Sequence, residues 1–111
     1  MLEHVELSML LSHYGAMLTE RQRTLLALSV DEDLSLSEIA EQAGISRQAV
    51  LDAIKRAESQ LYAIEAALGM EKLTRTLREK AEVLAALPAV AGNAEAQALA
   101  GEILEIINDG V

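Results

Sequence analysis

The sequence predicts an all-α protein, with a helix-turn-helix domain of three to four helices followed by a C-terminal helical extension. Glycine and proline are sparse, with six Gly and one Pro in 111 residues, so few positions interrupt helices. Apolar residues recur at helical spacing, and residues suited to cap a helix precede several of these runs. We place the domain at 1–68, its helix-turn-helix motif at 35–61 and the extension at 70–111.

The first expected helix covers residues 2–16. Its apolar side chains should lie near one face; they are Val5, Met9, Leu10 and Tyr14. Gly15 leaves the end of this helix ill-defined. His4 and His13 lie nine residues apart without a nearby third ligand, which is too poor a set for a metal site. We therefore expect no bound metal and interpret both histidines as surface or boundary residues.

A second helix is expected to begin after Thr19. Thr19 and Gln22 have the spacing of a capping box. The apolar side of this helix comprises Leu25, Leu26 and Leu28. Arg21 and Arg23 stand in its first turn, where a DNA strand could pass in a helix-turn-helix complex. On composition alone, they could equally be a pair of solvated arginines.

The helix-turn-helix motif has its own start and stop signals. Ser35 and Glu38 form a second capping box at the start of its first helix. Gly44 can adopt the left-handed conformation that ends a helix. Ser46 follows directly and is suited to cap the second helix. The coincidence of these signals with an apolar pattern predicts two helices joined by a tight turn.

Packing inside the motif is expected to depend on small and branched residues. Ala40 is small enough for a second helix to cross closely, and Val50 should face inward. The rest of the expected apolar lattice is Ile39, Ala43, Ile45, Ala53, Ile54, Ala57 and Leu61. If Val50 faces inward, the outward positions of the second helix are Gln48, Leu51, Asp52 and Lys55, with Arg47 exposed in the first turn.

These outward residues suit contact with DNA. Arg and Gln can read guanine and adenine edges from the first turn of a recognition helix. Arg56 and the Ser46 hydroxyl could contact phosphates, and Leu51 could meet a thymine methyl group. The candidate DNA-binding residues are Ser46, Arg47, Gln48, Leu51, Asp52, Lys55, Arg56, Arg21 and Arg23. An ordinary solvated helix face carries the same residue types, so this alternative stays open.

The motif's second helix is expected to continue until Gly69. Two more helices are expected in 70–87 and 93–107, separated by Pro88 and Gly92. Their apolar residues are Leu73, Leu77, Leu84 and Leu87 in the first and Ala96, Leu99, Ala100, Ile103, Leu104, Ile106 and Ile107 in the second. Two short helices cannot bury this surface alone. They must fold back on the preceding helix or meet a second copy, and we expect a homodimer.

Composition limits the other function classes. The net charge is −9 at pH 7, which opposes binding to DNA at long range. Residues 46–61 carry +1, so they form the least repulsive part of their domain. The chain has no Cys, so disulfides and thiol chemistry are excluded. It has no basic signal-peptide region and no run of 18 apolar residues, so we expect a cytoplasmic protein that does not span a membrane.

The chain resembles the YlxM family of small bacterial helix-turn-helix proteins. The segments that carry the resemblance are SHYG (12–15), LTERQR (18–23), DLSLSEIAE (33–41), GISRQAV (44–50), DAIKR (52–56) and the Leu68-Gly69 helix end. The motif also resembles the fourth region of bacterial sigma factors. The resemblance implies an all-α, winged-helix-like or sigma region-four-like DNA-binding module. It also implies a regulatory role linked to the signal recognition particle, through its GTPase or its RNA.

Two functional hypotheses remain, and a third class is set aside. The first is a DNA-binding regulator whose second motif helix enters a major groove. The second is an adaptor for the signal recognition particle GTPase or its RNA, which the acidic surface favours because such a chain suits a basic partner. We expect no enzyme and no cofactor, because the sequence lacks a Gly-rich phosphate loop, a nucleophile with its base, and a metal cluster.

Overall fold

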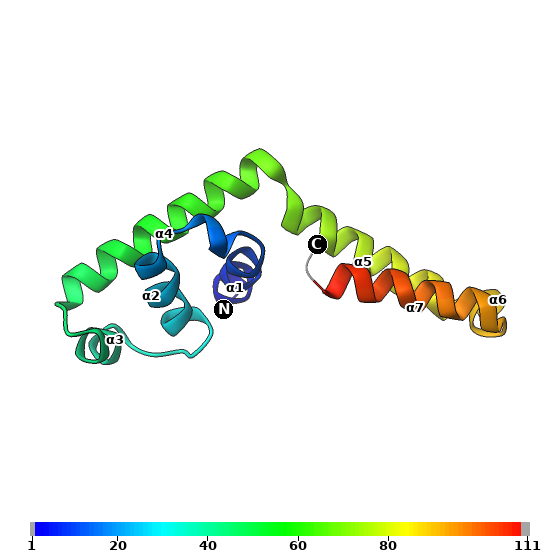
Figure 1. Ribbon diagram of the computed structural model, residues 1–111, viewed down its shortest axis with the longest axis horizontal. Helices are drawn as coiled ribbons and strands as arrows, with labels where there is room; N and C mark the ends of the chain where they lie inside the picture. Colours follow the sequence, from blue (N-terminus) through cyan, green and yellow to red (C-terminus); the bar gives the residue numbers. More distant parts are fainter. Residues whose placement is uncertain (1, 110–111) are drawn as a thin grey trace. The chain divides into compact units, whose positions relative to one another are not determined.

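The computed structural model describes residues 2–109, and of residues 2 and 3 only the backbone. Its described part consists of helices joined by short turns (Figure 1), which confirms the all-α class. The chain divides into two units, Met1–Gly69 and Met70–Val111. The first contains α1 (Leu2–Tyr14), the 3₁₀ helix η1 (Gly15–Met17), α2 (Glu20–Val30), α3 (Leu36–Ala43) and α4 (Arg47–Leu68). The second contains α5 (Met70–Ala86), α6 (Pro88–Ala91) and α7 (Ala94–Asn108).

The core of the first unit forms where α1, α2 and α3 pack against α4 (Figure 1). Its buried apolar side chains are Leu7, Leu10, Leu11, Tyr14, Leu18, Leu25, Leu26, Ile39, Ala40, Val50, Ile54, Ala57 and Leu61. The four from α4 are spaced by four, three and four residues, which is one stripe of a helix. Burial of this stripe holds α4 in place and leaves its opposite face to solvent.

Both predicted capping boxes are confirmed. The Gln22 backbone N–H donates to Thr19 Oγ1 at 3.1 Å, and the Thr19 N–H donates back to Gln22 Oε1 at 3.2 Å. Ser35 and Glu38 form the same pair of bonds at 3.1 and 3.0 Å. The Ser35 N–H lowers the pKa of Glu38, because it stabilises the charged carboxylate. A lowered carboxyl pKa means that this stabilisation is present near neutral pH and is lost as the pH falls through that pKa.

The turn of the motif is built as predicted. Gly44 has a φ of 70°, a left-handed conformation that favours glycine. The N–H groups of Gly44 and Ile45 both donate to the Ala40 carbonyl, at 2.9 and 3.1 Å, and so close the end of α3. Ser46 Oγ then accepts from the Ala49 N–H at 3.0 Å and begins α4. The turn therefore fixes the direction in which α4 leaves α3.

The predicted face of α1 was partly wrong. Val5 is 65% exposed, whereas Leu7 and Leu11 are buried beside the correctly expected Leu10 and Tyr14. At about 100° per residue, Leu7, Leu10, Leu11 and Tyr14 share one side of α1, whereas Val5 lies nearly opposite Leu7. On the buried side the Tyr14 hydroxyl donates to Glu65 at 2.6 Å. The helix also ends at Tyr14 and tightens into η1, rather than continuing to residue 16.

The second unit is a hairpin in which α5 and α7 pack side by side (Figure 1). Asn93 caps α7 through its Oδ1, which accepts from the Ala96 N–H at 3.0 Å. Pro88 was expected only to interrupt the helices, but it also begins the short α6, because its fixed φ suits a first helical position. None of the described helices is long and apolar enough to cross a membrane.

Candidate nucleic-acid interface

The exposed face of α4 carries most of the predicted site residues. Gln48, Asp52, Lys55 and Arg56 are all exposed, on the side of the helix opposite the buried stripe. Leu51 was expected to point outward with them, but it is half-buried. At about 100° per residue it lies to the side of the helix, between the core and the solvated face. The polar residues therefore form the outer face, and Leu51 forms its edge.

The first turn of α4 presents two further residues. Arg47 is exposed because no earlier turn of α4 covers this position. Ser46 is also exposed, but its Oγ already accepts the capping bond from Ala49. Its hydroxyl hydrogen remains available as a donor. The helix start thus offers a cation and a hydroxyl donor side by side.

Gln48 and Asp52 are joined by a hydrogen bond that the sequence reasoning did not foresee. Gln48 Nε2 donates to Asp52 Oδ1 at 3.0 Å, one helical turn along α4. The bond occupies part of the Gln48 amide and leaves its oxygen and one N–H for a ligand. The signal for it in the sequence is the four-residue spacing of a Gln and an Asp, which suits such pairs on helices.

A hollow next to this face joins α4 to the start of α2. It is lined by Gln22, Lys55, Arg56, Ser59 and Gln60. Lys55 and Arg56 were predicted site residues, whereas Gln22, Ser59 and Gln60 were not. Ser59 could have been found from the sequence, because it continues the spacing of Gln48, Asp52 and Lys55 along one helix face.

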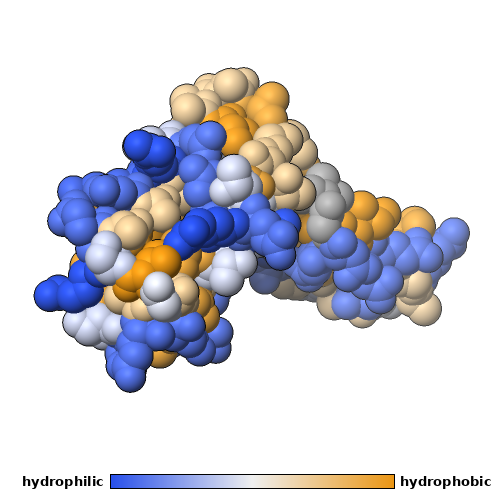
Figure 2. All heavy atoms as spheres, turned by 60° about the vertical axis from the view of Figure 1, so that its left-hand side comes forward, coloured by the Kyte–Doolittle hydropathy of each residue, from blue (hydrophilic) through white to orange (hydrophobic). Residues whose placement is uncertain are grey.

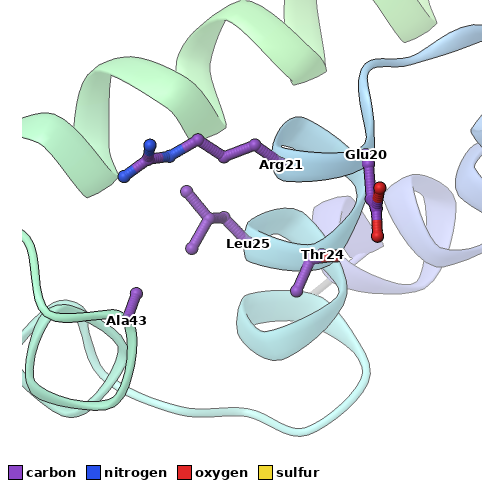
Figure 3. Close-up of a pocket in the computed structure, with 5 residues that line it drawn as sticks. All are labelled: Glu20, Arg21, Thr24, Leu25 and Ala43. Atoms are coloured by element: carbon purple, nitrogen blue, oxygen red, sulfur yellow. The ribbon is translucent and has the colours of Figure 1, made fainter.

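Arg21 lies at a second hollow, formed by the first turns of α2 and the end of α3. This hollow encloses about 520 Å³ and is lined by Glu20, Arg21, Thr24, Leu25 and Ala43. In Figure 3 the Arg21 side chain extends from α2 towards α4, while Glu20 lies on the other side of α2. Ala43 was expected in the apolar lattice but is exposed at this hollow, because α3 ends there and no helix covers it.

Arg23 is placed differently from Arg21. A Cβ atom built on Gly15 would lie 3.5 Å from Arg23 Cδ, so the aliphatic part of the Arg23 side chain runs past η1. Two residues along a helix correspond to a rotation of about 200°, which turns Arg23 away from Arg21. Arg21 therefore belongs with the α4 residues, whereas Arg23 does not.

The cations of this surface have no acidic partner within the described residues. Arg21, Arg47, Lys55 and Arg56 are exposed, and none forms an ion pair with the part of the chain that is described. Figure 2 shows hydrophilic side chains surrounding a small apolar patch on the side of the first unit that faces the viewer. We call Ser46, Arg47, Gln48, Asp52, Lys55, Arg56 and Arg21 the α4 surface.

The histidines take no part in this surface. His4 Nδ1 lies 3.9 Å from Asp33 Oδ1, and His13 stacks at a tilt against Tyr14. Within residues 2–109 no group of three or more His, Cys, Asp or Glu side chains is suited to hold a metal ion. The chemistry that the α4 surface offers is therefore hydrogen bonding and charge, with four cations and the single carboxylate of Asp52.

Comparisons with known proteins give a consistent result. Residues 1–97 match the family described as "Putative helix-turn-helix protein, YlxM / p13 like", UPF0122. A UPF0122 protein of Clostridium botulinum is 44% identical over 82 residues, which cover 74% of this chain and 73% of the relative. Another from Desulforamulus reducens is 44% identical over 85 residues, covering 76% and 73%. No solved structure matches. The match confirms the resemblance to the YlxM family.

Proposed function

Because this chain belongs to the UPF0122 family of helix-turn-helix proteins, we propose that it is a DNA-binding regulator that inserts the start of α4 into a major groove. The observation that carries this proposal is the division of α4 into a buried stripe and an exposed polar face. Val50 and Ile54 hold the helix in the core, while Arg47 and Gln48 stay accessible. The activity requires no cofactor and takes place in the cytoplasm with the DNA.

The dimensions of DNA support this role for α4. The major groove of B-DNA is about 12 Å wide and admits one α-helix. In helix-turn-helix proteins, residues at the start of the recognition helix reach the base edges. Arg47 and Gln48 occupy that turn, whereas Lys55 and Arg56 stand two to three turns later. We assign base contacts to the first pair and phosphate contacts to the second.

Arg21 completes the phosphate contacts in this proposal. Its guanidinium group extends from α2 towards α4 (Figure 3), and Gln22 shares a hollow with Lys55 and Arg56. A phosphate strand that follows the edge of the groove would therefore meet groups from both helices. Arg23, which runs past Gly15, contributes only general positive charge, and Leu51 contributes an apolar edge for a thymine methyl group.

The acidic surface makes dimerisation part of the proposal. A single copy offers four cations against a chain of net charge −9, so it should bind DNA weakly. Two copies present two α4 helices to one duplex and double the number of phosphate contacts. Helix-turn-helix dimers meet half-sites about one helical turn of DNA apart, so we expect the target to be a short inverted repeat.

A salt series tests this proposal directly. Purified protein should select a subset of sequences from random duplexes at low salt. Each neutralised phosphate contributes about −0.9 to the slope of log K against log salt, so the three assigned phosphate contacts give about −2.7 and a dimer gives about −5.4. Binding would be measured by fluorescence anisotropy of the selected duplex. A flat dependence on salt, or no selected sequence, would refute DNA binding.

The net charge supports a second candidate function. An acidic chain suits a basic protein partner better than bare phosphate, which favours an adaptor that binds the signal recognition particle GTPase. The alternative adaptor that binds the particle's RNA has no such support from charge. The same titration with the GTPase and with the RNA separates the two functions. Binding to the GTPase that survives nuclease treatment, without selection of any DNA sequence, would favour the adaptor over the DNA-binding regulator.

Asp52 should determine base preference rather than affinity. The Gln48–Asp52 hydrogen bond presents the Gln48 amide in one orientation, and the Asp52 carboxylate can accept only from amino groups such as cytosine N4. Replacing Asp52 by Ala should raise affinity for random DNA, because a negative charge is removed, and should reduce the preference for the selected site. A bidentate contact is worth about 1–3 kcal/mol of discrimination.

Asp52→Asn provides the matched variant, because it removes the charge and keeps an oxygen that can accept from Gln48. It should retain more of the base preference than Asp52→Ala. Competition between selected and random duplexes measures that preference. Glu6→Ala removes an exposed charge from α1 and serves as the control for net charge. Equal changes for selected and random DNA in the two Asp52 variants would contradict this role.

A further inference from the structure

The hairpin of the second unit has a thin internal core. Its buried apolar side chains are Ala81 of α5 and Ala100 and Ile107 of α7. Two of these three are alanines, which bring the helix backbones close together but bury little apolar area. The larger apolar side chains of the hairpin must therefore lie elsewhere.

Those larger side chains remain exposed along a stripe on each helix. On α5 the stripe is Leu73, Leu77 and Leu84, and on α7 it is Leu99, Ile103 and Ile106. Each is between 44% and 62% exposed. Figure 2 shows apolar atoms at the surface of this hairpin next to bands of hydrophilic side chains. Single exposed apolar residues are normal, but a contiguous set marks an interaction site.

The two stripes point to the same side of the hairpin. Seen from its own N-terminus, each helix carries its stripe about a quarter turn counter-clockwise from the face that packs on the other helix. The two helices are antiparallel and face each other. A displacement of each stripe by the same quarter turn, seen from the N-terminus of its own helix, therefore puts both stripes on the same side of the hairpin. The six side chains therefore form one surface, which we call the hairpin face.

Charges at the two edges of the hairpin face have opposite signs. Lys80 lies at the outer edge of the α5 stripe and Glu102 at the outer edge of the α7 stripe, by the same helical geometry. Neither forms an ion pair with the described residues. The Arg78–Asn108 hydrogen bond at one end and the α6 turn at the other set the register of α5 and α7, which places Lys80 and Glu102 at about the same height.

We propose that the hairpin face is a homodimer interface in which two hairpins pack face to face and close a four-helix bundle. A two-fold axis along the hairpin sets α5 of one copy against α7 of the other, so that every neighbouring pair of helices is antiparallel. This rotation brings Lys80 to the partner's Glu102, and Glu102 to the partner's Lys80. The face is thus complementary to itself, which is the requirement for a two-fold interface.

The hairpin face is the surface through which the dimer of the proposed function would form. The proposal rests on that function only for the biological use of the dimer. Its readout is mass in the absence of nucleic acid, so it succeeds or fails independently of DNA binding. Sedimentation equilibrium of the whole chain should give a species of about twice 11.9 kDa at a concentration of about 10⁻⁴ M. That concentration exceeds a micromolar dissociation constant by about a hundredfold.

Two substitutions test the apolar part of the interface. Leu77→Asp and Ile103→Asp each place a charge in the hairpin face and should yield monomers. Val5→Asp alters a side chain of similar exposure in the first unit and should leave the dimer intact. Circular dichroism confirms that each variant retains its helices. A wild-type monomer at 10⁻⁴ M, or a dimer that survives both hairpin substitutions, would overturn the proposal.

Charge reversal tests the arrangement of the helices without altering the apolar contacts. Lys80→Glu and Glu102→Lys should each weaken the dimer by about three- to tenfold, since each change occurs twice by symmetry and exposed pairs are worth up to about 1 kcal/mol each. The double variant should recover to within about twofold. Glu105→Lys lies on the far side of α7 and serves as control. Failure of the double variant to recover would refute the pairing of α5 with the partner's α7.

Discussion

Replacing Leu26 by Ala is expected to lower the free energy of unfolding of the first unit by about 2–5 kcal/mol. Leu26 is fully buried in α2, the helix that packs on α4. Removal of its side chain leaves a cavity that the surrounding helices fill only in part, so both transfer free energy and packing are lost. A loss of this size is a large fraction of the stability of a small domain.

The two tyrosines make this prediction measurable in the first unit alone. Tyr14 and Tyr62 are the only tyrosines, and the chain has no Trp. Both lie in the first unit, so urea unfolding followed by tyrosine fluorescence reports on it. Val5→Ala is the matched control, because Val5 is 65% exposed, and it should change the stability by less than about 0.5 kcal/mol. A similar small change for Leu26→Ala would show that α2 does not form this core.

Local signals made two helix starts and the turn of the motif predictable. The capping boxes of Thr19 and Ser35 and the left-handed Gly44 each need only a few neighbouring residues, and the structure contains all three. A cap satisfies backbone groups that the helix itself leaves open, so its residues and spacing recur in any sequence that starts a helix there. This is why the helix starts and the turn agreed closely with the sequence.

Side-chain burial was less predictable because it depends on the neighbouring helices. Val5 and Leu7 are both apolar but lie on nearly opposite sides of α1, and only Leu7 is buried. The choice between them is made by the contact of α1 with the rest of the unit, including the Tyr14–Glu65 hydrogen bond across 51 residues. The exposure of Ala43 was not predictable for the same reason, because it follows from where α3 ends beside α2.

The sequence predicted most of the residues of the α4 surface, but not how they lie relative to one another. Periodicity placed Gln48, Asp52 and Lys55 on one face, and all three are exposed. It placed Leu51 there as well, although that side chain is half-buried. The spacing of Arg21 and Arg23 already places them on different sides of α2, but which of the two lies nearer α4 depends on how α2 packs, which no local pattern of α2 contains.

The double variant Arg47→Ala, Gln48→Ala is expected to weaken binding to the selected duplex by at least about thirtyfold. Each good bidentate contact with a base is worth about 1–3 kcal/mol, and 1.4 kcal/mol corresponds to about tenfold in affinity. The fold should tolerate the change, because both side chains are exposed and Ser46 continues to cap α4. Anisotropy titrations with selected and random duplexes would measure the effect.

Lys55→Ala, Arg56→Ala is the matched variant that separates base reading from attraction to phosphate. It removes two exposed groups from the same helix, but these groups stand where the phosphate strand should pass. It should weaken binding to selected and random duplexes alike and reduce the salt slope by about 2 per copy. The Arg47 and Gln48 variant should instead lose mainly the preference for the selected duplex. If both variants lost affinity equally for the two duplexes, α4 would act only as a patch of charge, and the start of the helix would not be the part that reads DNA.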